Sequence, residues 1–187
     1  MIVDDLNNIQ EWVNNRICSK VKCLIPYDEK TVKTYKPEYM HPKAIPMLLP
    51  PRDFSPKEYD HNIPSIVVQL MQGEDTLAED EERYQIRLVF CTWNPGSFQR
   101  EDDKTIVIKN MNGWEDSIRL IDIARNAIKH DVYIDGLRLD KTIPIQYGQF
   151  FEDGDARNES YPYWFSWLTF TLIKGVKTQT NTYDEYL

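Results

Sequence analysis

The segment that decides the fold reads Tyr161-Pro162-Tyr163-Trp164-Phe165-Ser166-Trp167-Leu168-Thr169-Phe170-Thr171-Leu172. Successive side chains of a β-strand point to opposite faces of the sheet, so alternate residues share a face. One face here carries Tyr161, Tyr163, Phe165 and Trp167, and the other carries Trp164, Leu168, Phe170 and Leu172. A strand with one face in water shows polar residues at alternate positions, whereas both of these faces are apolar. We therefore expect this strand to be covered on both sides, by helices of its own chain or by another subunit.

The length and net charge of the chain limit the classes of protein to which it can belong. Its 187 residues suffice for one domain whose core needs no disulfide or metal. The formal net charge of -8 argues against wrapping duplex nucleic acid or binding an anionic membrane, although a local basic patch stays open. Cys18, Cys23 and Cys91 lack the paired spacing of a zinc site, so we expect reduced thiols. We expect neither a signal peptide nor a membrane span, and hence a protein folded in a cytoplasm.

Two segments have helical periodicity, at about residues 2–19 and 114–130. The apolar positions are Ile2, Leu6, Ile9, Val13 and Ile17 in the first and Trp114, Ile118, Ile121, Ala124 and Ile128 in the second. Asn112, three residues before Glu115, predicts a capping box. Leu120 and Ala127 make the second apolar face broader than one sheet contact requires, so part of it should meet the first helix or a neighbouring chain.

The remaining pattern predicts a sheet and an irregular arm. Strands are expected at residues 21–25, 65–72, 83–93, 132–134, 137–139 and 142–149, with shorter candidates at 44–49 and 105–108. An acidic turn over residues 73–82 should join the second and third of these, and Asp135-Gly136 predicts a hairpin turn. Prolines interrupt residues 26–64, which we interpret as a proline-rich arm or insertion that packs on a neighbour.

These elements predict an α+β fold with a mainly antiparallel sheet and two amphipathic helices packed on it. We expect a single domain over residues 1–174 that includes the arm at residues 26–64. Residues 175–187 should form a polar C-terminal tail.

No motif assigns chemistry to the chain. The three histidines are scattered, and the acidic loop at residues 152–159 does not match the spacing of a calcium-binding loop. Phosphate-binding glycine loops, nucleophile elbows and paired His-Glu helix motifs are missing from the sequence. We therefore assign no catalytic residue, cofactor or metal ligand and predict that the chain is not an enzyme. Two carboxylates brought together by folding beside the aromatics, as in a glycosidase cleft, stay an alternative without positive support.

The aromatic residues permit more than one reading. Five tryptophans could form a carbohydrate-binding platform, namely Trp12, Trp93, Trp114, Trp164 and Trp167. Tryptophans with apolar neighbours in strands and helices are more often core or interface residues, and we favour an interface. The interface residues that we predict are Trp114, Ile118, Tyr163, Trp164, Phe165 and Trp167. A third possibility is an adaptor whose proline-rich arm docks on a partner.

The order of elements resembles that of tail terminator and tail completion proteins of long-tailed phages. The resemblance rests on the opening helix, a strand ending in Ile25-Pro26, the strand Pro64–Gln69, the helix from Gly113-Trp114-Glu115, the strand Thr142–Gln149 and the closing aromatic strand. It covers residues 64–174 best. The arm at residues 26–64 is longer than the family pattern, which leaves open a role as another neck or tail component.

The resemblance implies a structural protein of the virion tail, assembled in the cytoplasm of a bacterial host. Such a protein forms a hexameric ring at the head-proximal end of the tail tube, ends tube polymerisation and joins the tail to the head. The implied partners are further copies of the chain, the major tail tube protein and the head–tail connector protein, with no cofactor, no membrane and no sequence-specific binding of the DNA that passes through. A ring joins two different surfaces of each subunit, so each chain needs two apolar patches.

Overall fold

The computed structural model describes residues 1–26, 37–49, 62–76, 80–101, 104–150 and 160–175. Two α-helices, a 3-10 turn and eleven strands lie in this part of the chain. Their order is α1 (Ile2–Arg16), η1 (Cys18–Lys20), β1 (Cys23–Leu24), β2 (Tyr39–Met40), β3 (Lys43–Pro46), β4 (Ser65–Thr76), β5 (Glu81–Trp93), β6 (Gly96–Glu101), β7 (Lys104–Lys109), α3 (Trp114–His130), β8 (Tyr133–Ile134), β9 (Leu137–Leu139), β10 (Gln146–Gln149) and β11 (Tyr163–Gly175).

Seven strands form the main sheet, in the order β3-β4-β5-β11-β9-β8, with β10 paired to β11 beside β9. The aromatic strand β11 pairs with β5 over its whole length, from Tyr163 opposite Trp93 to Gly175 opposite Glu81. All pairs in the main sheet are antiparallel except β3 with β4, which is parallel. Two further sheets have two strands each, β1 with β2 and β6 with β7.

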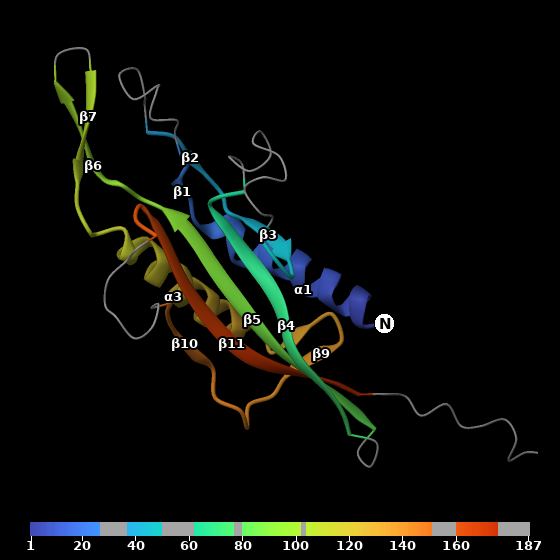
Figure 1. Ribbon diagram of the computed structural model, residues 1–187. Coiled ribbons are helices and arrows are strands. Elements are labelled where there is room, and N and C mark those ends of the chain that lie inside the picture. The colour runs from blue at the N-terminus through green and yellow to red at the C-terminus, as the bar shows by residue number, and fades with distance from the viewer. Residues whose placement is uncertain (27–36, 50–61, 77–79, 102–103, 151–159, 176–187) are drawn as a thin grey trace, which may run out of the picture.

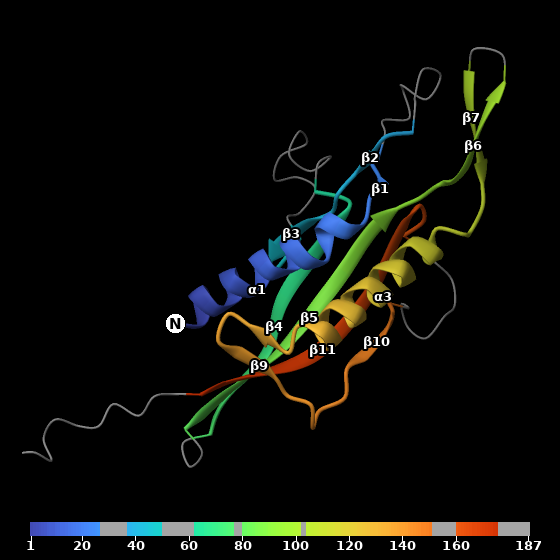
Figure 2. The ribbon, with the colours of Figure 1, turned by 180° about the vertical axis from the view of Figure 1, so that it is seen from behind.

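Both helices cover the same face of the main sheet (Figures 1 and 2). Helix α1 packs against β3 and β4, and α3 packs against β5 and β11. On the opposite face no helix is found within the described ranges. We call this face the helix-free face. The α+β fold with a mainly antiparallel sheet and two helices packed on it is thus confirmed. Neither α1 nor α3, the helices that the structure describes, has the length and apolar content needed to cross a membrane.

The main core lies between the helices and the sheet. It contains most of the predicted apolar positions of both helices, although Ile2 and Trp114 are exposed. With one face of each long strand it includes Ile9, Val13, Leu120, Ile121, Ala124, Ile86, Leu88, Phe90, Leu168, Phe170 and Leu172. The broad apolar face expected for the second helix is therefore largely used inside the chain. Leu120, which widens that face, is fully buried.

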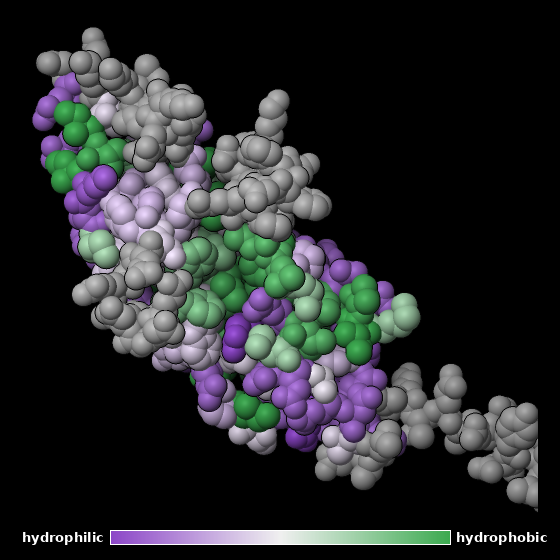
Figure 3. Space-filling model, in the orientation of Figure 1, coloured by the Kyte–Doolittle hydropathy of each residue, from purple (hydrophilic) through white to green (hydrophobic). Residues whose placement is uncertain are grey.

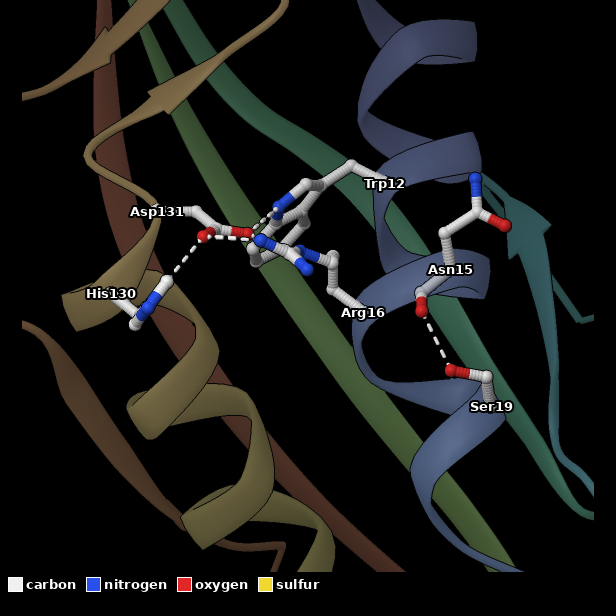
Figure 4. Close-up of polar contacts among 6 residues, drawn as sticks. All are labelled: Trp12, Asn15, Arg16, Ser19, His130 and Asp131. Atoms are coloured by element: carbon white, nitrogen blue, oxygen red, sulfur yellow. Dashed lines mark hydrogen bonds and ion pairs between the residues drawn. The ribbon is translucent and has the colours of Figure 1, made fainter.

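Asp131, directly after α3, links the two helices (Figure 4). Its carboxylate accepts hydrogen bonds from the guanidinium of Arg16, at 2.5 and 2.8 Å, and from the indole N–H of Trp12 at 3.0 Å. Nδ1 of His130 lies 2.7 Å from the same carboxylate. The Arg16 guanidinium, followed by His130, holds the pKa of Asp131 well below its usual range. The side chain that closes the gap between α1 and α3 is therefore a carboxylate at neutral pH.

The predicted strands before and after the acidic turn were too short. Strand β4 continues to Thr76 and β5 begins at Glu81, so most of the expected turn is paired strand. Glu74 lies directly opposite Arg83 across this ribbon, and its side chain is exposed. Acidic residues are tolerated on β4 here because Gly73, Glu74 and Asp75 are all exposed to water.

The strands expected from the sequence do not include β6, whose residues 96–101 pair with residues 104–109 of β7 in a hairpin. Only the candidate strand at residues 105–108 was expected, and it is confirmed as part of β7. Strand β6 carries Ser97, Gln99, Arg100 and Glu101, all exposed, so no apolar period marked it as a strand.

Two further local predictions are corrected. The capping box at Asn112 is not formed, because the N-cap of α3 is Gly113 and no side chain caps it. The backbone carbonyl of Asn112 instead accepts a hydrogen bond from the N–H of Glu115. The strand expected at residues 142–149 is confined to Gln146–Gln149. Thr142 belongs to a turn, in which its N–H and its hydroxyl both donate to the Asp140 carboxylate.

The edge strand expected at residues 44–49 is confirmed in a slightly shifted position, as β3, and the strand expected at residues 21–25 shortens to β1. Much of the proline-rich arm (residues 27–36 and 50–61), the acidic loop at residues 152–159 and the tail after residue 175 lie outside the described residues. The boundaries of the single domain stay a prediction.

Candidate assembly surfaces

The helix-free face of β11 carries the aromatic residues that motivated the interface prediction. The register places Tyr163 opposite Trp93, Phe165 opposite Cys91 and Trp167 opposite Val89. Tyr163 and Trp93 join a second apolar cluster with Leu24, Ile63 and Phe98. Phe165 and Trp167 are half-buried, and the guanidinium of Arg87 lies 5.6 Å from the centre of the Trp167 ring. This row is thus partly shielded by its own chain.

Trp164 lies on the other side of β11 and is buried, with 7 % of its surface exposed. Its indole N–H donates to the carbonyl oxygen of Asn94 at 3.0 Å. Tyr161 packs edge-on against its ring, with the ring centres 6.3 Å apart. Trp164 therefore joins the end of β5 to the start of α3 inside the protomer.

The hairpin β6–β7 projects beyond one end of the main sheet (Figures 1 and 2). Ile106 lies opposite Gln99 and Ile108 opposite Ser97, so both isoleucines share one face of the hairpin. They are 40 % and 43 % exposed. Met111 and Trp114, on the connection into α3, are 53 % and 45 % exposed. We call Ile106, Ile108, Met111 and Trp114 the hairpin patch.

A two-stranded hairpin is marginally stable in water unless its apolar face is covered. The opposite face of β6–β7 is anchored by Phe98, which packs against the second apolar cluster. The face with Ile106 and Ile108 has no such cover from the described residues, and hydrophobic surface is visible over this hairpin in Figure 3. A protein partner that covers this face would stabilise the hairpin.

A second exposed apolar group follows β3 on the main sheet. Met47 and Leu48 are 43 % and 72 % exposed, and we call this pair the β3 patch. Hydrophobic surface extends over β3 and β4 in Figure 3, well separated from the hairpin. Met47 has a φ of 63°, a left-handed conformation that costs a non-glycine residue about 1–2 kcal/mol. Its N–H donates to the carbonyl oxygen of Val68 at 2.8 Å, which fixes this strained turn to β4.

The outer edge of β3 is closed by α1. The amide oxygen of Asn14 accepts the N–H of Ala44 at 2.9 Å, and the amide nitrogen of Gln10 donates to the carbonyl oxygen of Ala44, also at 2.9 Å. Exposed strand edges normally invite pairing with a further strand. Because α1 occupies the backbone groups of Ala44, a partner would meet the β3 patch through side chains.

The six predicted interface residues are thus divided among different environments. Trp114 belongs to the hairpin patch, Ile118 is half-buried against the main core, and Trp164 is internal. Tyr163, Phe165 and Trp167 line the helix-free face. The predicted interface residues do not include Ile106, Ile108, Met47 and Leu48, although the last two belong to the arm that was expected to pack on a neighbour. The consecutive apolar residues Ile106, Val107 and Ile108 in β7 could have been a signal for the first two, but nothing in the sequence marks Met47 as left-handed.

In the described part of the chain, no group of three or more His, Cys, Asp or Glu side chains could hold a metal ion. Burial raises the pKa of the Cys18, Cys23 and Cys91 thiols to about 12. All three are free and buried, as expected for reduced thiols. Nδ1 of His41 lies 2.7 Å from the carbonyl oxygen of Val21 and 3.2 Å from that of Cys18, so this ring links η1 to the arm.

Comparison of the sequence with protein-family models gives no match, and comparison with curated proteins gives none either.

Proposed function

We propose that the chain is a structural subunit of a long-tailed phage tail that assembles into a ring, hexameric by the resemblance of its sequence. The ring would sit at the head-proximal end of the tail tube, end tube polymerisation and join the tail to the head connector. A different neck or tail component of the same virion is the runner-up. The proposal includes no catalytic step and no cofactor.

The observation that carries the proposal is the separation of two exposed apolar patches on one chain. The hairpin patch lies on an element that projects beyond the sheet, and the β3 patch lies on the main body (Figures 1 and 3). A closed ring is built from heterologous contacts, in which one surface of each subunit meets a different surface of the next. In the arrangement that we propose, Ile106 and Ile108 of one copy pack on Met47 and Leu48 of its neighbour.

The strained turn at Met47 supports the same arrangement. A left-handed residue is usually glycine, since other side chains clash there with the backbone. Methionine supplies flexible apolar surface that adapts to a partner, which glycine does not. An interface explains why a methionine is kept at a position where glycine would be less strained.

A carbohydrate-binding platform has less support. Such a surface needs several aromatic rings open to solvent, whereas Trp93 and Trp164 are 5 % and 7 % exposed and Trp12 and Trp167 are half-buried. Trp114 is exposed but belongs to the hairpin patch.

Growth of tail tubes in the presence of the purified chain tests the proposed function. The tube protein would come from the phage or prophage that encodes the chain, and tube lengths would be measured by negative-stain electron microscopy. We expect shorter tubes with extra density at one end. Tubes of unchanged length without bound protein would contradict the proposal.

A matched pair of variants controls this test. I106S/I108S replaces the exposed isoleucines of the hairpin patch and should abolish the effect on tube length. K129Q changes an exposed residue near the end of α3, far along the helix from the patch, and should act as the wild type. Equal activity of both variants would show that the hairpin patch is not used.

A further inference from the structure

The hairpin β6–β7 forms a sheet of its own, and neither of its strands pairs with the main sheet within the described residues. Strand pairing therefore does not set the angle at which the hairpin leaves the body of the molecule (Figures 1 and 2). Phe98 packs on the second apolar cluster, but apolar contact is not directional. The angle must come from the two places where the chain enters and leaves the hairpin, at residues 94–95 and 110–113.

Asn94, at the entry, is fixed to the main sheet through its backbone. Its N–H donates to the carbonyl oxygen of Pro162 at 3.0 Å, directly before β11. Its carbonyl oxygen accepts the indole N–H of Trp164 in β11, also at 3.0 Å. The side chain of Asn94 therefore starts from a position that is already held by the aromatic strand.

The side-chain amide of Asn94 joins the hairpin to α3. Its Oδ1 accepts the N–H of Gly96, the first residue of β6, at 2.9 Å. Its Nδ2 donates to Oδ2 of Asp116, in the first turn of α3, at 2.7 Å. An N–H must meet the oxygen of the amide and a carboxylate must meet its nitrogen, so these partners also fix which way the amide faces. Hydrogen bonds to a carboxylate are among the stronger ones in proteins.

The base of the hairpin is closed tightly, so the two strands move as one unit. Gly96 has a φ of 128°, and a Cβ atom there would lie 2.2 Å from the carbonyl oxygen of Ile108. At the exit, Nδ2 of Asn110 donates to the hydroxyl of Ser97 at 3.0 Å, and its Oδ1 accepts the N–H of Asn112 at 3.1 Å. A bond that holds Gly96 therefore holds the whole hairpin.

We infer that Asn94 is a positioning residue, whose side chain holds the hairpin at one angle to the main sheet before a second copy of the chain binds. The inference rests on the proposed function, in which the hairpin patch meets a neighbouring copy. Asn94 is not part of that patch. An element that already has its bound orientation associates more tightly, because less ordering has to occur on binding.

Two pairs of variants separate this role from charge and from folding. D116A removes the acceptor of the Asn94 amide, and E115A removes the neighbouring acidic residue of the same helical turn, which is exposed. N94D places two carboxylates face to face. N94D/D116N restores one amide donor between them and has the net charge of the wild type. Melting temperatures verify the fold of each variant, and D116A retains the first comparison if N94D does not fold.

Double electron–electron resonance measures the orientation of the hairpin. Spin labels at E101C and K129C lie near the tip of the hairpin and near the end of α3, at two exposed positions. The three native cysteines are buried, and dilution with unlabelled chain restricts the signal to distances within one chain. We expect the same narrow distance distribution for wild type, E115A and N94D/D116N, and a broader or shifted one for D116A and N94D.

Sedimentation velocity of the unlabelled variants measures the consequence for assembly. D116A and N94D should self-associate at least about tenfold more weakly than E115A and N94D/D116N. The inference would be overturned by wild-type distances in D116A and N94D, or by equal self-association of D116A and E115A. A wild type that does not self-associate contradicts the ring instead, and the distances alone then support or overturn the role of Asn94.

Discussion

A Cβ atom added to Gly113 would lie 2.1 Å from Nε1 of Trp164. Gly113 has a φ of -62°, which any residue adopts, so glycine is required there by the indole ring and not by the backbone. This contact seats the start of α3 on β11 and leads directly into the hairpin patch at Trp114. The packing of Gly113 against Trp164 therefore fixes the position of Trp114, an exposed residue of the hairpin patch.

G113A should destabilise the fold by about 1–3 kcal/mol, since the added methyl group overpacks a filled site. It should also disturb the hydrogen bond from Trp164 to Asn94 and shift the tryptophan emission. Urea unfolding followed by fluorescence measures both effects. G148A is the matched control, because a Cβ there would lie 3.5 Å from the Trp167 ring, which is an ordinary contact. Equal stability of both variants would contradict the role given to Gly113.

Asp131 gives the protein a defined response to acid. Its pKa in the folded chain lies below that of an unfolded aspartate, so folding favours the carboxylate. The resulting stability is fully present above about pH 5 and is lost as the pH falls through about 4 toward the lower folded value. Unfolding free energies of wild type and D131N should differ at pH 6, and the difference should shrink steadily as the pH falls below about 4. A difference that does not change with pH would exclude this origin.

Trp12 tests the same junction without changing a charge. W12F removes the indole N–H that donates to Asp131 and retains most of the apolar side chain. Loss of one hydrogen bond to a charged acceptor should lower the free energy of unfolding by about 1–2 kcal/mol. Chemical denaturation at pH 7 is the appropriate measurement. No change in stability would mean that Arg16 alone is enough to hold Asp131.

Asn14 should matter for the closed edge of β3. N14A removes the acceptor of the Ala44 N–H, which we expect to lower stability by about 1 kcal/mol and to promote aggregation through the opened edge. N15A is the control, because Asn15 accepts the Ser19 hydroxyl on its backbone carbonyl, which the substitution retains. Thermal melts with light scattering measure both properties. Aggregation of N15A to the same extent would argue against edge protection.

The sequence predicted the fold well wherever one chain segment carries a clear period. Trp164, Leu168, Phe170 and Leu172 face the helices, as their alternation implies. It failed where a strand is defined by the strand that it pairs with and not by a period of its own. Strand β6 consists largely of exposed polar residues and is a strand because it pairs with β7. The parallel pairing of β3 with β4 is another such case, which no local pattern reveals.

The candidate site was harder to predict for a related reason. The two apolar faces of β11 are real, but helices cover one of them and a second apolar cluster shields part of the other. The exposed apolar side chains of the two patches lie on or beside short elements, among them Ile106, Ile108, Met47 and Leu48. Exposure depends on the tertiary fold around a residue, so a strand pattern alone does not show which apolar residues are left open.

Substitutions at Met47 and Leu48 should test assembly of the chain without a large effect on its folding. M47G relieves the left-handed strain but adds the backbone entropy of glycine, so the free energy of unfolding should stay within about 1 kcal/mol of the wild type. L48S replaces a side chain that is 72 % exposed and should also leave stability nearly unchanged. The double variant M47G/L48S should nevertheless lose self-association. Self-association as strong as that of the wild type would remove the β3 patch from the interface.

The mass of the full chain in solution tests most directly whether its two exposed apolar patches meet between copies. Sedimentation velocity should be measured over a concentration series for wild type, I106S/I108S and M47G/L48S. We predict that the wild type forms a closed species of six times the 22.2 kDa chain mass, and that both variants sediment as single folded chains. A wild type that remains a single chain at the highest soluble concentration, or variants that assemble as it does, would contradict the proposed ring.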